Sequence, residues 1–333
     1  MRNDKPPLTR WPASQQAVEQ VQAFNRKLAW LPRLKVFSPW VLRLAQGLLR
    51  LSQLGGSRSL RKQGLRAETG QVAMGDVMVP VRIIRPQTQA KGVVLDFHGG
   101  GWVIGNAQMN DKFNSAMVTA CDVAVVSVDY RLAVSAPMEA LLEDCLCAAR
   151  WLLDENNSEF AGLPVTVVGE SAGGHLAVAT LLRLKQWPDL FKRVTGALLY
   201  YGVYDLTGTP SVRNAPAETL LLDGPGMVDA LRMLTPDLSD EQRRAPPLSP
   251  LHGDFAGFPP ALMFAGELDP LLDDTCLLAE RWASSAEVEC QVLPCAPHGV
   301  IHFPLALAND VLIHARHWIT ARNEAYASHN ANS

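Results

Sequence analysis

After residue 70 the chain alternates between short apolar runs and longer segments whose apolar residues recur with a helical period. The runs are mostly continuous, which is typical of strands buried on both faces of a sheet. They span residues 79–84, 93–97, 123–128, 165–169, 197–201 and 261–265. Helices are expected between them at residues 107–120, 137–153, 172–186, 273–286 and 304–322. This alternation predicts an α/β fold with a mostly parallel central sheet flanked by helices.

Two amphipathic helices are expected before this pattern begins. The first covers residues 14–30, with Ser14 as a candidate N-cap. The second follows Ser38, has Pro39 at its first position and ends at Gly55-Gly56. Such helices either pack on the protein or lie on an anionic membrane surface, and the packing interpretation is favoured.

Charge divides the chain at about the same place. The 30 Lys and Arg nearly balance the 33 Asp and Glu, and the net charge of −3 argues against a dedicated nucleic-acid binder. Residues 1–70, however, hold 13 Lys or Arg and three acids, a charge of +10 that leaves −13 for the remainder. We therefore expect a basic helical segment over residues 1–70, a catalytic domain over 71–322 and a flexible tail over 323–333. Seven prolines mark residues 206–250 as an insertion in that domain.

Composition and cysteine spacing narrow the class of protein further. The 48% of apolar residues can form a substantial core, which excludes an intrinsically disordered chain. The six cysteines form no C-x-x-C pair, so neither a zinc site nor a disulfide framework is indicated, and no metal is expected. No signal-peptide pattern and no run of 18 apolar residues occurs. We expect a cytoplasmic protein without stable membrane insertion.

The sequence Gly169-Glu170-Ser171-Ala172-Gly173-Gly174 is the strongest chemical signal. It lies between a predicted strand and a predicted helix, which is the context of a nucleophile elbow. The glycines permit a tight turn that exposes the Ser171 hydroxyl. A plain glycine-rich turn is the alternative interpretation.

A second glycine motif, His98-Gly99-Gly100-Gly101-Trp102, follows the run at 93–97. Glycines let backbone N–H groups approach a developing oxyanion closely. A phosphate-binding loop is the alternative, but Gly-Lys-Ser/Thr does not follow.

Together the two motifs resemble those of the α/β-hydrolase superfamily, and more narrowly those of the hormone-sensitive-lipase-like esterases. The resemblance covers about residues 75–320 and includes Asp129-Tyr130-Arg131-Leu132-Ala133. Tyr201-Gly202-Val203-Tyr204 and the acidic block from Gly266 to Asp274 look most like bacterial acetyl esterases. The resemblance implies a serine carboxylesterase for short-chain acyl esters that needs no metal or organic cofactor. It also implies that residues 1–70 and 206–250 form a cap over the site.

The resemblance also implies roles for specific residues of this chain. It implies a triad of Ser171, Asp269 and His298, in the order Ser, acid, His along the chain. Glu267, Asp273 and Asp274 are the alternative acids, and His302 is the alternative base. It also implies oxyanion donors at the N–H groups of Gly100, Gly101 and Ala172, with Gly99 as a possible replacement. Candidate substrate-binding residues are Gly99, Trp102, Tyr201 and His302, whereas His98 is expected to shape the loop and His175 to pack or face solvent.

One segment departs from the family pattern. Many relatives have Pro-Glu-His-Pro after Tyr-Arg-Leu-Ala, where this chain has Val134-Ser135-Ala136-Pro137. Any contact of that Glu and His is therefore absent or replaced. A non-catalytic binder on the same fold, a membrane-associated lipid hydrolase, and an amidase or peptidase remain as alternatives. The expected partner is a small-molecule ester, and the chain is expected to be a monomer or homodimer.

Overall fold

The computed structural model describes residues 8–31, 33 and 39–331. Its internal contacts divide the chain into two compact units. Unit 1 contains the described residues up to 33 together with Leu199–Ala315, and unit 2 contains Pro39–Leu198 and the chain from Arg316 onwards. The basic N-terminal segment is thus divided between the two units. Each unit is described separately below.

Unit 2 is built on strands in the order β6-β4-β5-β3-β2. They are β2 (Arg66–Met74), β3 (Val77–Arg85), β4 (Gly92–Phe97), β5 (Val123–Val128) and β6 (Val165–Glu170). Strand β4 runs parallel to β5 and β6, and β3 runs antiparallel to β5 and β2. Every residue of β4, β5 and β6 is buried, as their continuous apolar runs predicted. Strand β2 was not expected, because most of its residues are exposed and it shows no apolar run.

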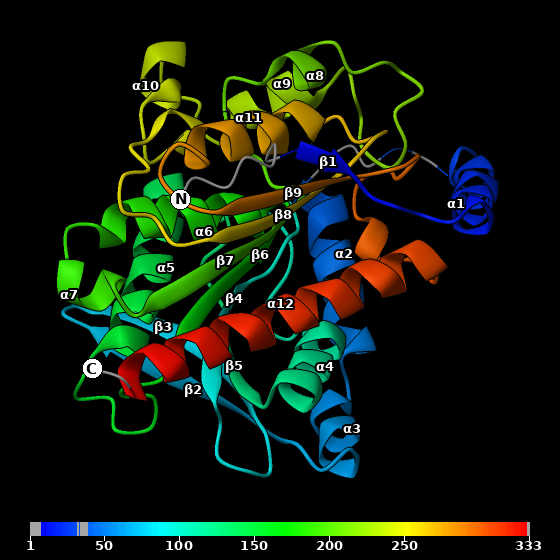
Figure 1. The fold of residues 1–333 in the computed structure, drawn as a ribbon. Helices are drawn as coiled ribbons and strands as arrows, with labels where there is room; N and C mark the ends of the chain where they lie inside the picture. The colour runs from blue at the N-terminus through cyan, green and yellow to red at the C-terminus, as the bar shows by residue number, and fades with distance from the viewer. Residues whose placement is uncertain (1–7, 32, 34–38, 332–333) are drawn as a thin grey trace. The chain divides into compact units, whose positions relative to one another are not determined.

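The helices of unit 2 include two that pack against each other beside this sheet. They are α5 (Met138–Leu153) and α6 (Ala172–Leu184), which are also the most deeply buried helices of this unit (Figure 1). The others are α2 (Pro39–Ser52), α3 (Gly56–Lys62), α4 (Asp111–Cys121) and α7 (Pro188–Phe191). Strand β7 (Val194–Tyr200) and helix α12 (Ala306–Ala331) each run through a boundary between the units. Helix α12 continues well beyond residue 322, through most of the segment expected to be a tail.

Unit 1 contains a second group of parallel strands. Strand β9 (Val288–Leu293) lies between β8 (Ala261–Gly266) and the short β1 (Leu8–Arg10), and is parallel to both (Figure 1). Helix α11 (Leu272–Trp282) packs on β8 and β9. The 206–250 insertion forms only short helices, α8 (Pro210–Arg213), α9 (Met227–Met233) and α10 (Asp240–Arg244). The predicted α/β architecture, mostly parallel with flanking helices, is confirmed.

The N-terminal helices form close to their expected positions. Helix α1 spans Gln15–Leu28, and the Ser14 hydroxyl caps it by accepting the Ala17 N–H at 3.2 Å. Helix α2 starts at Pro39, while its expected cap Ser38 lies outside the described residues. Gly55, with φ of +83°, separates α2 from α3. The expected end at Gly55-Gly56 is therefore a break between two helices.

A buried carboxylate joins the chain after β7 to helix α11 within unit 1. The Asp274 carboxylate accepts the N–H groups of Tyr204 at 2.6 Å and Asp205 at 3.1 Å, and the Thr209 hydroxyl at 2.5 Å. Its side chain is fully buried, and this burial raises its pKa to about 7 against the opposing effect of the three donors. Asp274 therefore holds residues 204–209 in place.

We expect Asp274→Ala to lower the free energy of unfolding by about 2–4 kcal/mol, because three buried donors lose their acceptor. Asp274→Asn keeps one acceptor oxygen and should lose less. Urea denaturation at pH 7 measures both changes, with the exposed turn residue Asp76→Ala as the control. A loss below about 0.5 kcal/mol for Asp274→Ala would contradict this role.

Candidate active site

Ser171 occupies a sharp turn between β6 and α6 in unit 2. Strand β6 ends at Glu170 and α6 begins at Ala172, so the serine alone makes the turn, with φ of 51° and ψ of −120°. A Cβ on Gly169 would lie 2.4 Å from the Gly173 carbonyl oxygen, and one on Gly173 would lie 1.9 Å from the Phe97 oxygen. Both positions therefore require glycine. The strand–turn–helix context predicted from the motif is present.

The second glycine motif lies directly after β4 in the same unit. Gly100, Gly101 and Trp102 all have positive φ, at 104°, 60° and 62°. A Cβ on Gly99 would lie 3.3 Å from the Glu170 carbonyl oxygen, so this loop contacts the residue that precedes Ser171. A Cβ on Gly100 would lie 1.9 Å from the Ile104 oxygen. The structure thus brings the two sequence motifs together.

Trp102 is buried rather than open to solvent. Its indole Nε1 donates to His175 Nδ1 at 3.2 Å, and the two rings meet edge to face at 5.2 Å. His175 lies one turn after Ser171 on α6. The contact therefore ties the glycine loop to the helix that follows the serine. Trp102 was expected to bind substrate and His175 to pack or face solvent, but a contact between the two was not predicted from the sequence.

The buried His98 side chain makes a hydrogen bond to the backbone of the glycine loop. Its Nδ1 lies 2.8 Å from the Gly99 oxygen and donates to it, because a carbonyl can only accept. The Tyr130 ring stacks on the imidazole at 4.2 Å, and its hydroxyl donates to the His98 oxygen at 2.6 Å. Burial lowers the pKa of His98 to about 4, although the Gly99 carbonyl and the Glu170 charge oppose this shift.

Asp96 is a second buried polar residue that the sequence analysis did not single out. It is one acidic residue within an otherwise apolar run. The Asp96 carboxylate, on β4, accepts from Asn110 at 3.2 Å, Asn114 at 2.9 Å and Ser127 at 2.8 Å. Burial raises the pKa of Asp96 to about 6 despite these donors. This cluster joins β4 and β5 to helix α4 and to Asn110, the residue before it.

Unit 1 contains a histidine–carboxylate pair. Asp269 follows β8, and His298 lies in the loop after β9. His298 Nδ1 is 2.8 Å from Asp269 Oδ2, and the other carboxylate oxygen accepts the Leu271 N–H at 2.9 Å. A carboxylate oxygen accepts, so His298 Nδ1 donates this hydrogen bond. The Tyr201 ring packs against the imidazole at 4.9 Å.

The alternative acids have other partners in the same unit. Glu267 accepts the Cys295 N–H at 2.7 Å and pairs with Arg10 at 3.2 Å. Asp273 accepts the Ser211 N–H at 2.8 Å, and Asp274 makes the contacts described above. His302, the alternative base, is an exposed residue at the end of the short 3₁₀ helix Val300–His302.

Each predicted site residue therefore has a defined place. Ser171, Ala172 and the glycine loop with Trp102 lie in unit 2, whereas Asp269, His298, Tyr201 and His302 lie in unit 1. All six cysteines are free. Within the described residues no group of three His, Cys, Asp or Glu is arranged to hold a metal. None of the described helices combines the length and apolar character needed to cross a bilayer.

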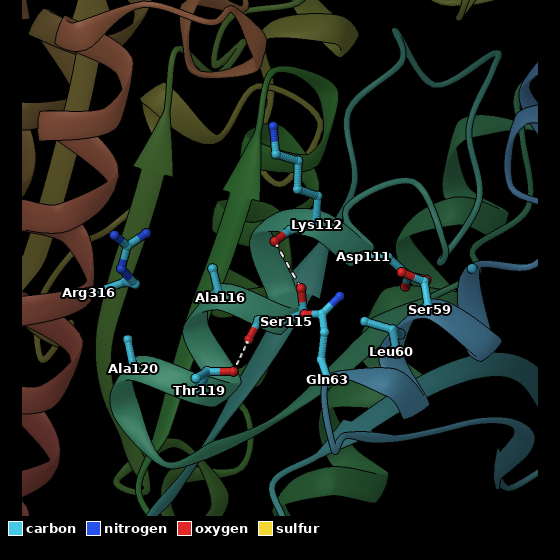
Figure 2. Close-up of a pocket in the computed structure, with 11 residues that line it drawn as sticks. Ser59, Leu60, Gln63, Asp111, Lys112, Ser115, Ala116, Thr119, Ala120 and Arg316 are labelled. Atoms are coloured by element: carbon cyan, nitrogen blue, oxygen red, sulfur yellow. Dashed lines mark hydrogen bonds between the residues drawn. The ribbon is translucent and has the colours of Figure 1, made fainter.

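A hollow of about 680 Å³ elsewhere in unit 2 contains none of the predicted site residues. Residues of α3 and α4 line it together with Arg316, and Figure 2 shows Lys112 and Gln63 at its wall. Its hydrogen bonds in this view, Ser115 to Lys112 and Thr119 to Ser115, belong to α4 itself. The residues that line the hollow include no histidine and no cysteine.

Comparison with known proteins places the chain in a family. The sequence model of a family described as the alpha/beta hydrolase fold matches residues 94–302. The chain is 35% identical over 241 residues to the carboxylesterase NlhH of Mycobacterium tuberculosis, covering 69% of this chain and 73% of that protein. It is 29% identical over 253 residues to an acetyl-hydrolase of Streptomyces hygroscopicus, covering 72% of this chain and 81% of that protein.

A solved structure shows the same fold. An esterase from the bacterial hormone-sensitive lipase family superposes with a TM-score of 0.72 at 24% identity, covering 93% of this chain and 99% of that chain. The family expected from the two glycine motifs is confirmed. The chain belongs to the α/β-hydrolase fold family and is a carboxylic ester hydrolase.

Proposed function

We propose that the protein is a serine carboxylesterase that hydrolyses short-chain, acetyl-like esters through an acyl-enzyme. The observation that carries the proposal is the 2.8 Å hydrogen bond between His298 and Asp269, two residues that follow Ser171 in the chain order of this family. The acetyl-hydrolase relative supports the choice of a small acyl group. The substrate is a small-molecule ester, and the free cysteines agree with a reducing, cytoplasmic location.

In this mechanism Ser171 Oγ attacks the ester carbonyl carbon while His298 Nε2 takes the hydroxyl proton. The tetrahedral intermediate collapses, the C–O bond to the alcohol breaks, and His298 returns its proton to the leaving oxygen. Water, deprotonated by the same imidazole, then attacks the acyl-enzyme and releases the carboxylic acid. Asp269 holds the Nδ1–H tautomer and stabilises the imidazolium. The cycle consumes one ester and one water and needs no cofactor.

The proposed oxyanion donors are the N–H groups of Gly100, Gly101 and Ala172, with Gly99 as the alternative in the loop. The positive φ angles of Gly100 and Gly101 support this assignment, because they turn successive peptide groups in a way that bulkier residues rarely adopt. Ala172 opens α6, so its N–H is one of the unpaired donors at a helix start. One such donor is typically worth about 10²–10³ in turnover.

Residues around these groups would select the substrate. Tyr201 contacts the His298 ring, and this contact favours a position for Tyr201 beside the acyl group or the alcohol group of the bound ester. Gly99, Trp102 and His302 remain further substrate-binding candidates, with Trp102 acting through its backbone because its ring packs on His175. A cap formed by residues 1–70 and 206–250 remains part of this proposal.

Ser171→Ala should remove acylation and lower kcat by about 10⁴–10⁶, because the nucleophile is lost. His298→Ala should lower kcat by at least about 10³, whereas His302→Ala should stay within about tenfold of the wild type. Hydrolysis of p-nitrophenyl acetate and labelling by an organophosphonate measure these effects. A larger loss for His302→Ala than for His298→Ala would reverse the assignment of the base.

Activity should be highest for acetyl or butyryl esters and should fall towards decanoyl esters. A series of p-nitrophenyl esters from acetyl to decanoyl, compared by kcat/KM, tests the proposed acyl size. A maximum at octanoyl or decanoyl would instead favour a lipid hydrolase. No turnover with any ester, together with no labelling of Ser171, would favour a non-catalytic binder.

The depressed pKa of His98 predicts a loss of stability in acid. The folded protein keeps this ring neutral down to about pH 4, whereas the unfolded chain binds a proton below its ordinary value of 6.5. The stability that the neutral His98 ring contributes to the folded state is therefore fully present above pH 7. It is lost as the pH falls from 6.5 towards 4, because the unfolded chain then binds a proton that the folded protein does not. Between pH 7 and 4.5, His98→Gln should lose less unfolding free energy than the wild type, by on the order of 2 kcal/mol.

Urea denaturation at several pH values measures this difference. His317→Gln, which changes an exposed histidine, is the matched control and should follow the wild-type curve. Parallel pH profiles for the wild type and His98→Gln would show that His98 is not held neutral by burial.

A further inference from the structure

Helix α2 in unit 2 has apolar side chains on two opposite faces, of which one is half-buried and the other exposed. Trp40, Val41, Leu44, Leu48 and Leu51 follow one stripe and are between 56% and 76% exposed. The opposite face is half-buried and consists of Leu42, Ala45, Gln46 and Leu49. Leucines therefore lie on both faces of the helix, and those of the outer stripe are left in solvent. A contiguous exposed apolar stripe of this kind marks an interaction surface.

The inner face of α2 is fixed to the chain that follows the glycine loop. The Gln46 side chain bonds both backbone groups of Gly105, donating to its oxygen at 2.8 Å and accepting its N–H at 2.9 Å. The Gln53 and Asn106 side chains exchange two hydrogen bonds of 3.0 and 2.8 Å. These paired amides orient the helix, so the outward position of the apolar stripe is part of the folded unit.

Charge identifies the partner that suits this stripe. Between Pro39 and Ala67 the chain has six Lys or Arg and no Asp or Glu. Arg43 extends over the Trp40 ring at 5.4 Å, and Arg50 is exposed beside the stripe. The basic residues after the helix, Arg58, Arg61, Lys62 and Arg66, are exposed as well. An apolar helix face with exposed arginines beside it and further basic residues after it complements the headgroup and acyl layers of an anionic bilayer.

We propose that the α2 stripe docks the protein reversibly on an anionic lipid surface, with Trp40 and the leucines in the interfacial layer and the arginines at the headgroups. A second copy of the chain fits this face less well, because it would bring two basic segments together. Docking through α2 would also hold the chain after the glycine loop close to the bilayer, through the Gln46–Gly105 pairing. This docking requires only the exposed apolar stripe and the arginines beside it, and it does not require the proposed ester hydrolysis.

Flotation of the full chain with vesicles tests the proposal. The Ser171→Ala background prevents any hydrolysis from altering the lipid. We expect binding to phosphatidylcholine vesicles that contain 30% phosphatidylglycerol to exceed binding to pure phosphatidylcholine at least tenfold, and to weaken as NaCl rises from about 50 to 500 mM. The triple variant Trp40→Ser/Leu44→Ser/Leu48→Ser and the charge variant Arg43→Glu/Arg50→Glu should each lower binding at least tenfold.

Matched controls separate docking from damage to the fold. Met78→Ser and Val134→Ser remove exposed apolar side chains elsewhere in unit 2 and should leave vesicle binding unchanged. Circular dichroism and thermal melting confirm that each variant is folded. Binding to neither kind of vesicle, or binding that the α2 variants do not change, would overturn the proposal. Light scattering that shows a dimer broken by the triple variant, without vesicle binding, would assign the stripe to self-association instead.

Discussion

The close approach of two backbone segments at the start of α6 determines the geometry of unit 2. The Cα of Gly173 lies so near the end of β4 that a single methyl group would overlap the Phe97 carbonyl. Because no side chain separates them, the turn that bears Ser171 and the loop that begins at His98 are joined through backbone contact. The buried strands β4 and β6 supply the rigid platform on which it rests.

Buried polar groups then fix the loops that the apolar core cannot orient. The hydrophobic effect is not directional, whereas a hydrogen bond to a buried carbonyl or carboxylate specifies one conformation. His98 and Tyr130 define the glycine loop in this way, and Trp102 ties it to His175. Asp274 does the same for the chain after β7. The raised pKa of Asp274 and the lowered pKa of His98 are the electrostatic cost of placing ionisable groups in such positions.

The N-terminal region connects these loops to the surface in two different ways. Helix α1 belongs to unit 1, where Asn25 donates to the Cys295 oxygen at 2.8 Å and Phe24 packs on Phe303 at 4.8 Å. Helix α2 belongs to unit 2, where Gln46 holds Gly105. Both helices therefore touch a chain segment near a proposed catalytic group. A basic segment that looked uniform in sequence serves two separate parts of the molecule.

The sequence by itself determined the buried strands, the main helices and the family, because continuous apolar runs and the two glycine motifs depend on local chain properties. Strand β1 was missed because three residues show no period, and β2 because its side chains are mostly solvated. The resemblance already implied Asp269 as the partner of His298, and the tertiary structure shows their hydrogen bond. Tertiary structure alone decided that Trp102 turns inward to His175. It also decided that α2 turns Leu44, Leu48 and Leu51 outward and Leu42 and Leu49 inward, since the partners of its inner face lie more than fifty residues along the chain. Such contacts depend on which distant segments meet in the folded chain, and the local spacing of residues does not predict them.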